Sequence, residues 1–123
     1  MLFNRLRKHT FHNRYEALAF EYFSALGYVG ITHNYRSRCG EIDLIMLDQS
    51  TTVFIEVKFR ASDHFGSAAQ SVTLQKQHKI IQTAQLFLAA FPTYANDCRF
   101  DVLAMTKNDQ TYHYHHIPSA FIV

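Results

Sequence analysis

Two apolar runs separated by four polar residues form the clearest pattern in the chain. Residues 39–47 and 52–59 are rich in residues that favour β-strands, and residues 48–51 between them are short, polar and turn-like. The pattern predicts a β-hairpin that reverses at Gln49 and Ser50. Side chains alternate between the two faces of a strand. One face of this hairpin is therefore predicted to be wholly apolar, formed by Ile42, Leu44, Met46, Val53, Ile55 and Val57.

The opposite face of the predicted hairpin carries charges at one end. In the register set by the turn, Asp43 faces Glu56, and Glu41 faces Lys58. A slip of one residue would place charges on the apolar face, so the hydrophobic pattern supports this register. Two carboxylates directly opposite each other lie roughly 5 Å apart and repel, which points to a cation between them. Mg²⁺ is commonly held by one or two carboxylates together with substrate phosphates. An exposed face with a weak ion-pair network is the simpler alternative.

Apolar residues recur at helical spacing in two segments outside the hairpin. The first helix is predicted at about residues 13–26, and the following Gly27 ends it. The second is predicted at about residues 73–91 and ends before Pro92. In the first helix, Glu16 flanks the apolar stripe, so its side chain is predicted to point at an edge of the sheet. An ordinary first-turn glutamate, favoured by the helix dipole, is the simpler alternative.

Three more strands complete the predicted sheet. They are expected at residues 28–38, 99–105 and 111–117, with a turn at Asn108 and Asp109 between the last two. The element order is then α-β-β-β-α-β-β. This order predicts an α/β fold with a single mixed β-sheet and flanking helices.

Length and composition indicate one domain. The 123 residues suffice for a single core, and a hydrophobic content of 48% excludes a disordered chain. The basic lead at residues 1–11 lacks the apolar run of a signal peptide, and no stretch is long enough to span a bilayer. Cys39 and Cys98 lack the spacing of a metal finger. We therefore expect a cytoplasmic protein with no membrane partner.

The placement of charge bears on the choice of partner. A formal net charge of +2 neither requires nor excludes a polyanion. The long loop predicted at residues 60–71 would lie beside the charged end of the hairpin. A solvated surface explains any single lysine. Several basic residues together match the footprint of a phosphate backbone: Arg36, Arg38, Arg60, Lys76 and Lys79.

The last predicted hairpin carries three histidines. His113 and His115 share one strand face and His116 takes the other, so only two of them converge locally. A structural zinc site needs four ligands, which argues against a metal role. Asp101 is predicted to face His116 across the hairpin as a structural pair.

The charged residues of the first hairpin resemble the signature of a nuclease superfamily. Asp43 followed by Glu56-Val-Lys58 is similar to the PD-(D/E)xK pattern, whose members share a restriction-endonuclease-like core. After residue 12, nearly the whole chain also resembles the bacterial, largely uncharacterised YraN family, which is compared in fold with archaeal Holliday-junction resolvases. The segments that carry this second resemblance include Asn34-Tyr-Arg36, Gly40-Glu-Ile-Asp-Leu-Ile45, Val53-Phe-Ile-Glu-Val-Lys58, Phe65-Gly66 and Arg99-Phe-Asp-Val102.

The resemblance implies roles for four residues. Asp43 and Glu56 match the metal ligands, and Lys58 matches the catalytic lysine. Glu16 matches the helical glutamate that resolvase-like members add to the site, so it is expected to assist as a further ligand. Tyr15 departs from the pattern, in which we expect glycine before that glutamate.

The activity implied is that of an endonuclease that uses Mg²⁺ or Mn²⁺ to hydrolyse DNA phosphodiester bonds. Branched recombination or repair intermediates are the substrates that the resemblance suggests. Two alternatives stay open. The same fold can serve as a catalytically silent nucleic-acid-binding module. Alternatively, the edge of the last hairpin, where Tyr112 and Tyr114 are predicted to be exposed, can form a homodimer.

Overall fold

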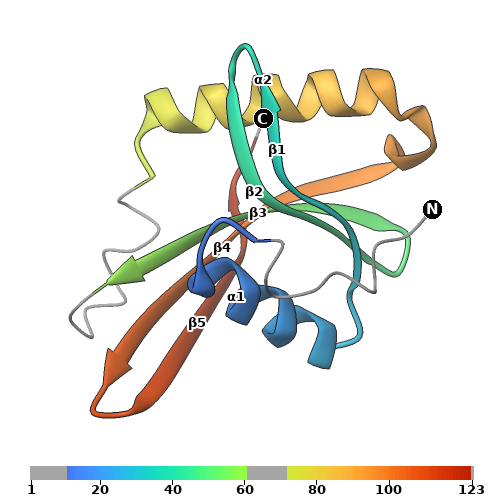
Figure 1. Ribbon diagram of the computed structural model, residues 1–123. Helices are drawn as coiled ribbons and strands as arrows, with labels where there is room; N and C mark the ends of the chain where they lie inside the picture. The colour runs from blue at the N-terminus through green and yellow to red at the C-terminus, as the bar shows by residue number, and fades with distance from the viewer. Residues whose placement is uncertain (1–10, 61–71, 123) are drawn as a thin grey trace.

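A computed structural model describes residues 11–60 and 72–122 (Figure 1). The predicted basic lead, apart from Phe11, and the predicted loop beyond Arg60 lie outside the described residues. The helical elements are α1 (Arg14–Ala25), α2 (Leu74–Ala90) and the short 3₁₀ helix η3 (Pro92–Tyr94). The strands are β1 (Val29–Ser37), β2 (Gly40–Asp48), β3 (Thr51–Arg60), β4 (Asp97–Asn108) and β5 (Thr111–Phe121).

The strands form one mixed sheet in the order β1-β2-β3-β4-β5. Neighbouring strands are antiparallel except for β3 and β4, which are parallel and are connected through α2. A parallel pair needs such a long crossover, usually a helix. The predicted α/β fold with element order α-β-β-β-α-β-β is confirmed. Neither helix of the described segments is long and apolar enough to cross a membrane.

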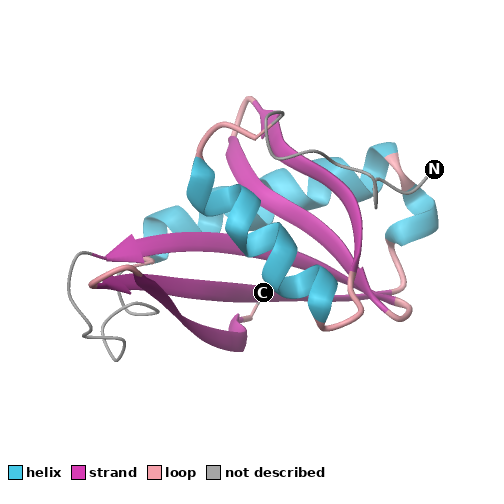
Figure 2. Cartoon of the chain, turned by 60° about the horizontal axis from the view of Figure 1, so that its bottom comes forward, coloured by secondary structure: helices cyan, strands magenta, loops and turns pink. Residues whose placement is uncertain are grey.

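The two helices pack on opposite faces of the sheet (Figure 2). On the α1 face, the cluster is built around Phe23 with Leu44, Met46, Val53, Ile55, Leu103 and Met105. On the α2 face, it is built around Phe87 with Ile31, Ile42, Ile45, Phe54, Phe100 and Val102. Since both faces of the central strands are buried, the charged residues on these strands must find partners within the protein.

One member of the predicted apolar face lies on the other side of the sheet. Ile42 was expected beside Leu44 but packs in the α2 cluster. Its partner on β1 is Tyr35, which follows Asn34 with its positive φ of 50°, and a register shift lies further along β1 between Gly30 and Thr32. Such irregularities increase local twist and bend the pair of strands. At the start of β2, Gly40 lies against α2, where a Cβ atom would lie 3.3 Å from Cβ of Lys79.

Both helices begin with a side-chain cap. The amide of Glu16 donates to Oδ1 of Asn13 at 3.0 Å, and the amide of Lys76 donates to Oγ1 of Thr73 at 3.1 Å. These caps satisfy main-chain donors that the helix cannot satisfy itself. The observed ends lie within about a residue of the predicted ones. Each cap also fixes a charged residue, Glu16 or Lys76, in the first turn of its helix.

The register of the first hairpin is confirmed where the strands pair. Ile45 lies opposite Phe54, and the chain reverses at Gln49 and Ser50. The pairing runs from Asp48–Thr51 to Leu44–Ile55. The predicted main-chain pairs Asp43–Glu56 and Glu41–Lys58 lie beyond that point. Side-chain contacts take the place of the ladder there.

The second hairpin differs from its prediction in register. His116 lies opposite Leu103 rather than Asp101, because the strands close one residue later, with Asn108 paired to Thr111. Asp101 and His116 nevertheless share the α1 face and meet diagonally, with Nε2 of His116 2.7 Å from Oδ2 of Asp101. The predicted pair is confirmed as a contact.

The aromatic side chains of β5 also differ from the prediction. Tyr112 and Tyr114 were expected to be exposed, but both are half-buried. Tyr114 stacks on Tyr22 of α1, with ring centroids 5.0 Å apart. The alternation of strand faces turns both tyrosines toward α1, while His113 and His115 face outward.

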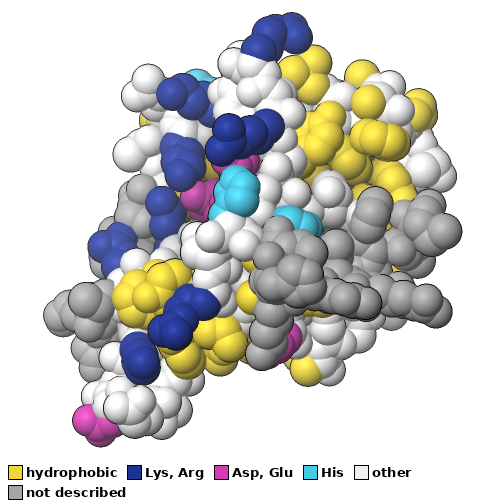
Figure 3. All heavy atoms as spheres, viewed as in Figure 1, with side chains coloured by type: hydrophobic (Ala, Val, Ile, Leu, Met, Phe, Trp, Pro, Cys, Tyr) yellow, Lys and Arg dark blue, Asp and Glu magenta, His cyan; other side chains and the backbone are white. Residues whose placement is uncertain are grey.

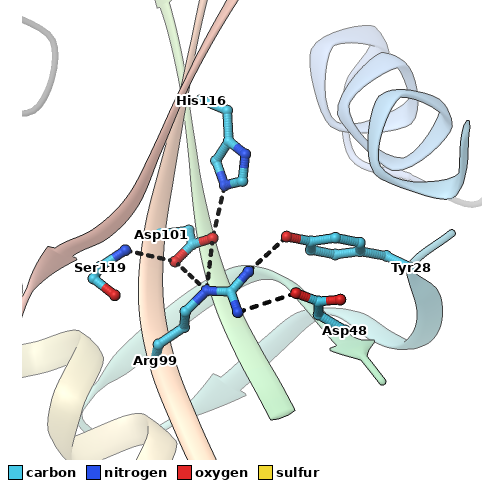
Figure 4. A network of polar contacts seen from close by, with 6 residues as sticks. All are labelled: Tyr28, Asp48, Arg99, Asp101, His116 and Ser119. Atoms are coloured by element: carbon cyan, nitrogen blue, oxygen red, sulfur yellow. Dashed lines mark hydrogen bonds and ion pairs between the residues drawn. The ribbon is translucent and has the colours of Figure 1, made fainter. Parts of the chain in front are cut away.

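A polar network links β4, β5, the end of β2 and the segment after α1 (Figure 4). Arg99 donates to Asp101, Asp48 and the hydroxyl of Tyr28. Asp101 is completely buried. Burial acts to raise the pKa of Asp101, but hydrogen bonds from His116, the Ser119 amide and Arg99 outweigh it and hold that pKa below its usual value. The network therefore stabilises the fold as an ionised, fully bonded cluster.

Candidate active site

The two carboxyl groups predicted to face each other meet where the β2–β3 ladder ends. Glu56 on β3 is buried, and Asp43 on β2 is half-buried. The amide of Val57 donates to Oδ2 of Asp43 at 2.9 Å. This side-chain hydrogen bond links β2 and β3 beyond the last main-chain pair of their ladder. Burial, the charges of Glu56 and Glu16, and a hydrogen bond with the Glu56 carboxyl raise the pKa of Asp43 to about 8, against the Val57 bond. A repelling pair of this kind favours a cation between its members.

Two lysines approach the same oxygen of Glu56. Nζ of Lys58, on β3, lies 3.7 Å from Oε2, and Nζ of Lys76, in the first turn of α2, lies 2.8 Å from it. Burial acts to lower the pKa of Lys76, but the hydrogen bond to Glu56 and the charges of Glu56 and Asp43 hold it above its usual value. Lys76 was predicted as a phosphate contact. The sequence alone could not show its pairing with Glu56, since the two residues meet only after the β3–α2 crossover.

Glu16 reaches the site from the other helix. It is buried in the first turn of α1, and its Oε1 accepts a hydrogen bond of 3.0 Å from Nδ2 of Asn34. The same Nδ2 donates to Oε2 of Glu41 at 3.0 Å. Asn34 thus joins two carboxylates that would otherwise repel each other.

Sequence reasoning gave Asn34 no role. The available signal was an asparagine in the middle of a predicted strand, where asparagine is disfavoured. Its φ of 50° places it in the left-handed region, which asparagine tolerates better than most residues. That conformation accompanies a side chain directed between Glu16 and Glu41.

Glu41 lies in a different environment from the one predicted. It was expected to face Lys58, but its carboxylate contacts Arg36 at 3.2 Å and His12 at 3.5 Å, besides Asn34. The reason is the end of the β2–β3 ladder at Leu44–Ile55, beyond which β2 is paired with β1 alone. Glu41 therefore connects the acidic site to the basic residues of β1.

The predicted basic residues lie on three elements and one turn. Arg36 is on β1, Arg38 is exposed in the following turn, and Arg60 ends β3. Lys76 and Lys79 line a cavity of about 280 Å³ at the beginning of α2, together with Gly40 and Glu41. On the face shown in Figure 3, Lys and Arg side chains surround a small group of acidic side chains. Within the site itself, Lys58 and Lys76 supply positive charge beside Glu56.

The residues present can be tested against the requirements of a divalent metal. In the described segments, no group of three or more His, Cys, Asp or Glu side chains is arranged to hold a metal ion. The pair Asp43 and Glu56 nevertheless suits Mg²⁺ or Mn²⁺, because two carboxylates can suffice when water and substrate phosphates supply the other oxygens. The Lys76 ammonium group already lies as a cation on Glu56. The carboxylates of Asp43 and Glu56, the second of which already contacts a cation, are therefore compatible with the metal, while Glu16 is held by Asn34.

Comparison with known proteins gives the family of the chain. A profile of the family described as uncharacterised protein family UPF0102 matches residues 15–105. The chain belongs to this family. It is 52% identical over 99 residues to "UPF0102 protein YraN" of Salmonella newport, covering 77% of this chain and 74% of that protein. The same figures hold for the proteins of that name from Salmonella enteritidis and Salmonella typhimurium.

The family match spans all the residues of the candidate site. Glu16, Asp43, Glu56, Lys58 and Lys76 fall between residues 15 and 105. The strand β5 lies beyond the matched region. The resemblance noted from the sequence is therefore confirmed at the level of the UPF0102 family, whose description assigns no activity.

Proposed function

We propose that this protein is a metal-dependent endonuclease of the restriction-endonuclease-like PD-(D/E)xK type, which hydrolyses DNA phosphodiester bonds in the cytoplasm. The observation that carries the proposal is the pairing of Asp43 with Glu56 at the end of a strand ladder, with Lys58 and Lys76 beside them. An ordinary surface ion-pair cluster does not bury a glutamate beside a second carboxylate. Buried like charges in a cationic setting are a feature of catalytic sites.

Asp43 and Glu56 are the residues that hold Mg²⁺ or Mn²⁺ in this proposal. Glu16 helps to hold the metal, either directly or through water, and its charge also acts on Asp43. When bound, the metal polarises the scissile phosphate and lowers the pKa of a water molecule. Asn34 keeps Glu16 and Glu41 in place, so the negative charge of the site stays beside the pair.

The lysines act on the phosphate. Lys58 lies on the same strand as Glu56, with its side chain 25% exposed, so it can reach a phosphate while it remains beside the carboxylates. It stabilises the charge that develops on phosphorus during hydrolysis. Lys76 is 46% exposed and leaves Glu56 when a metal binds there. Its ammonium group is then free to contact a phosphate oxygen.

The flanking cations position the nucleic acid. Arg36, Arg38 and Arg60 lie on β1, the β1–β2 turn and the end of β3, and Lys79 opens onto the cavity at the start of α2. The N-terminal end of a helix attracts phosphate through its free amides and its dipole. Cations on several elements suit a substrate that bends or branches around the site, such as a recombination or repair intermediate.

The test is cleavage of branched, duplex and single-stranded DNA by the purified protein in Mg²⁺ or Mn²⁺. Wild type is expected to cleave at least one substrate, and Asp43→Asn, Glu56→Gln and Lys58→Ala are expected to lose cleavage by a factor of about 100 or more. Asp109→Asn, at the tip of the second hairpin, is the matched control and retains full activity. Cleavage that survives both Glu56→Gln and Lys58→Ala rules out this site.

A catalytically silent nucleic-acid-binding module is the second candidate. It is favoured by the lack of a three-ligand group in the described segments and by the Lys76 contact that occupies Glu56. This function predicts binding at low salt, where phosphate contacts are strongest, without cleavage in either metal. It also predicts that Glu56→Gln leaves that binding unchanged.

A further inference from the structure

A second hollow in the molecule lies on the α1 face, away from the cavity at the start of α2. It is a groove of about 670 Å³ between the N-terminal turn of α1 and the end of the β4–β5 hairpin. That volume is within the range of about 300–1,000 Å³ typical of ligand sites. The groove is lined by Phe11, Asn13 and Arg14 on one side and by Lys107, Gln110 and Tyr112 on the other.

The chemistry of the groove is cationic and aromatic. Arg14 and Lys107 are exposed, and none of the described residues that line the groove is acidic. Nζ of Lys107 lies over the ring of Tyr112, 5.4 Å from its centroid. Figure 3 shows Lys and Arg side chains beside exposed hydrophobic side chains toward the end of this hairpin. Flat aromatic faces next to cations are the features with which proteins bind single-stranded nucleic acid.

The aromatic side of the groove is held in place by its neighbours. The ring of Tyr15 stacks on Phe59 at 4.2 Å and meets Tyr112 edge-on at 6.5 Å. Tyr15 stands where glycine was expected, and its ring supplies this packing. It anchors the start of α1 against β3 and β5 and holds the Tyr112 ring at the wall of the groove.

The groove adjoins the candidate active site. Asn13 lines the groove, and its Oδ1 accepts the amide hydrogen of Glu16. Phe11 also lines it, and its ring lies 4.3 Å from that of His33, whose Nδ1 is 2.7 Å from Oδ1 of Asn34. A single strand of nucleic acid in the groove would therefore end beside Asn13 and Asn34, the residues that hold Glu16.

We propose that this groove binds a single strand of nucleic acid, with one base stacked on Tyr112 and the adjoining phosphates held by Lys107 and Arg14. Lys107 moves from the ring to a phosphate as the base enters. The inference deepens the proposed function, on which it rests, because it makes the preferred substrate a duplex that carries a single-stranded arm. The arm lies along α1 while the duplex contacts the cations around β1 and α2.

Binding in EDTA, which excludes cleavage, tests the groove alone. Fluorescence anisotropy with labelled oligo-dT, oligo-rU and a blunt DNA duplex of equal length gives the three affinities. Tyr112→Leu is expected to weaken single-strand binding about tenfold, as expected for one lost stacking contact, and to change duplex binding less than about twofold. Tyr112→Phe keeps the flat ring and binds as wild type does. The ratio of the oligo-dT and oligo-rU affinities distinguishes DNA from RNA as the strand that is bound.

Matched variants separate the groove from general effects. Tyr114 lies on the same face of β5 as Tyr112, but it stacks on Tyr22 and does not line the groove. Tyr114→Leu is therefore expected to bind single strands with wild-type affinity. Lys107→Glu changes an exposed residue of the groove and is expected to weaken single-strand binding. It tests the groove independently if Tyr112→Leu does not fold. Equal losses on single strands and duplex, or no loss with Tyr112→Leu and Lys107→Glu, overturn the proposal. A dimeric mass that Tyr112→Leu reduces to that of one chain also overturns it, because a second copy then occupies the groove.

The two proposals fail separately. Binding that depends on Tyr112, with no cleavage of any substrate in Mg²⁺ or Mn²⁺, removes the endonuclease and keeps the groove. Cleavage that depends on Glu56, with single-strand binding unchanged in Tyr112→Leu and Lys107→Glu, keeps the endonuclease and removes the groove.

Discussion

Nζ of Lys76 lies 2.8 Å from Oε2 of Glu56, nearer than Nζ of Lys58 at 3.7 Å. A residue of α2 thus provides the closer of these two cationic partners of a carboxylate on β3. Any metal that binds Glu56 must compete with this contact. In the proposed function, Lys76 therefore lowers the affinity of Glu56 for the metal.

Removal of Lys76 is accordingly expected to tighten metal binding. Lys76→Met keeps the length of the side chain and removes its charge, and the affinity for Mn²⁺ should rise roughly three- to tenfold, a modest effect because the lysine is partly exposed. Isothermal titration measures it. Lys79→Met, one turn along the same helix, is the control and should change the affinity less. Weaker Mn²⁺ binding in Lys76→Met would falsify the competition.

The pKa of Asp43 predicts how stability changes with pH. Since its pKa in the folded protein is raised to about 8, the unfolded chain releases this proton at lower pH than the folded one. The contribution of Asp43 to stability is thus greatest below its unfolded pKa of about 3.9 and falls as pH rises toward 8. Thermal melts of metal-free protein should show a smaller decline in stability between about pH 4 and pH 8, the interval between those two pKa values, in Asp43→Asn than in wild type. Parallel declines contradict the assignment.

Metal binding should release a proton from the same group. Mn²⁺ needs the carboxylate form of Asp43, so its affinity should increase as pH rises toward 8. Titrations at matched ionic strength in buffers of different ionisation enthalpy report the released proton. Asp43→Asn should abolish both the release and its pH dependence, whereas Asp109→Asn should preserve them.

The bridging role of Asn34 can be tested by exchanging groups. Asn34→Asp keeps a residue that tolerates φ of 50° but replaces the donor between Glu16 and Glu41 by a carboxylate. It should reduce the free energy of unfolding by about 1–3 kcal/mol, because buried Glu16 loses its donor. Glu16→Gln in the same chain restores a donor and should recover part of the loss. Urea unfolding of the four proteins gives the coupling, and additive effects would exclude the bridge.

The buried network around Asp101 predicts acid sensitivity. Its pKa is held below the usual value, so the stability it provides is present above about pH 3.9 and is lost as pH falls through the folded-state pKa. Asp101→Asn should reduce the free energy of unfolding at pH 7 by about 3 kcal/mol, because Arg99 loses a buried charged partner. Denaturant melts between pH 2 and pH 7, a range that spans the usual pKa of aspartate, test this. An unchanged acid midpoint in the variant would contradict it.

Local patterns predicted most of the fold. The alternation of residues 39–59 placed Ile45 opposite Phe54, and the Asn13 and Thr73 caps lie at the first residues of the segments predicted as helices. These features depend on neighbours in sequence, where periodicity and capping chemistry suffice. The register predicted for the second hairpin was wrong because the turn lies one residue later than expected, with Asn108 paired to Thr111. A shift of the turn changes every pair of residues that follows.

The candidate site could be predicted only in part. Glu16, Asp43, Glu56 and Lys58 were identified from strand pairing and family resemblance, whereas the contacts of Asn34 and Lys76 were not. Those contacts depend on the point at which β2 leaves β3 and on how α2 returns to the sheet. Both are set by tertiary packing between distant segments, which the local pattern does not contain. The exposure of Tyr112 was misjudged for the same reason, since Tyr15 of α1 covers part of its ring.

The carboxylate pair lies at the opening of the β2–β3 ladder, with Glu16 in the first turn of one helix and Lys76 in the first turn of the other. The two helices occupy opposite sides of the sheet (Figure 2). In the chain, β1, β2 and β3 lie between Glu16 and Lys76. A nascent chain that has not yet produced α2 therefore holds Glu56 beside Lys58 but without Lys76. Glu56 gains its closer cationic partner only after synthesis has passed residue 76 and α2 has packed on the sheet.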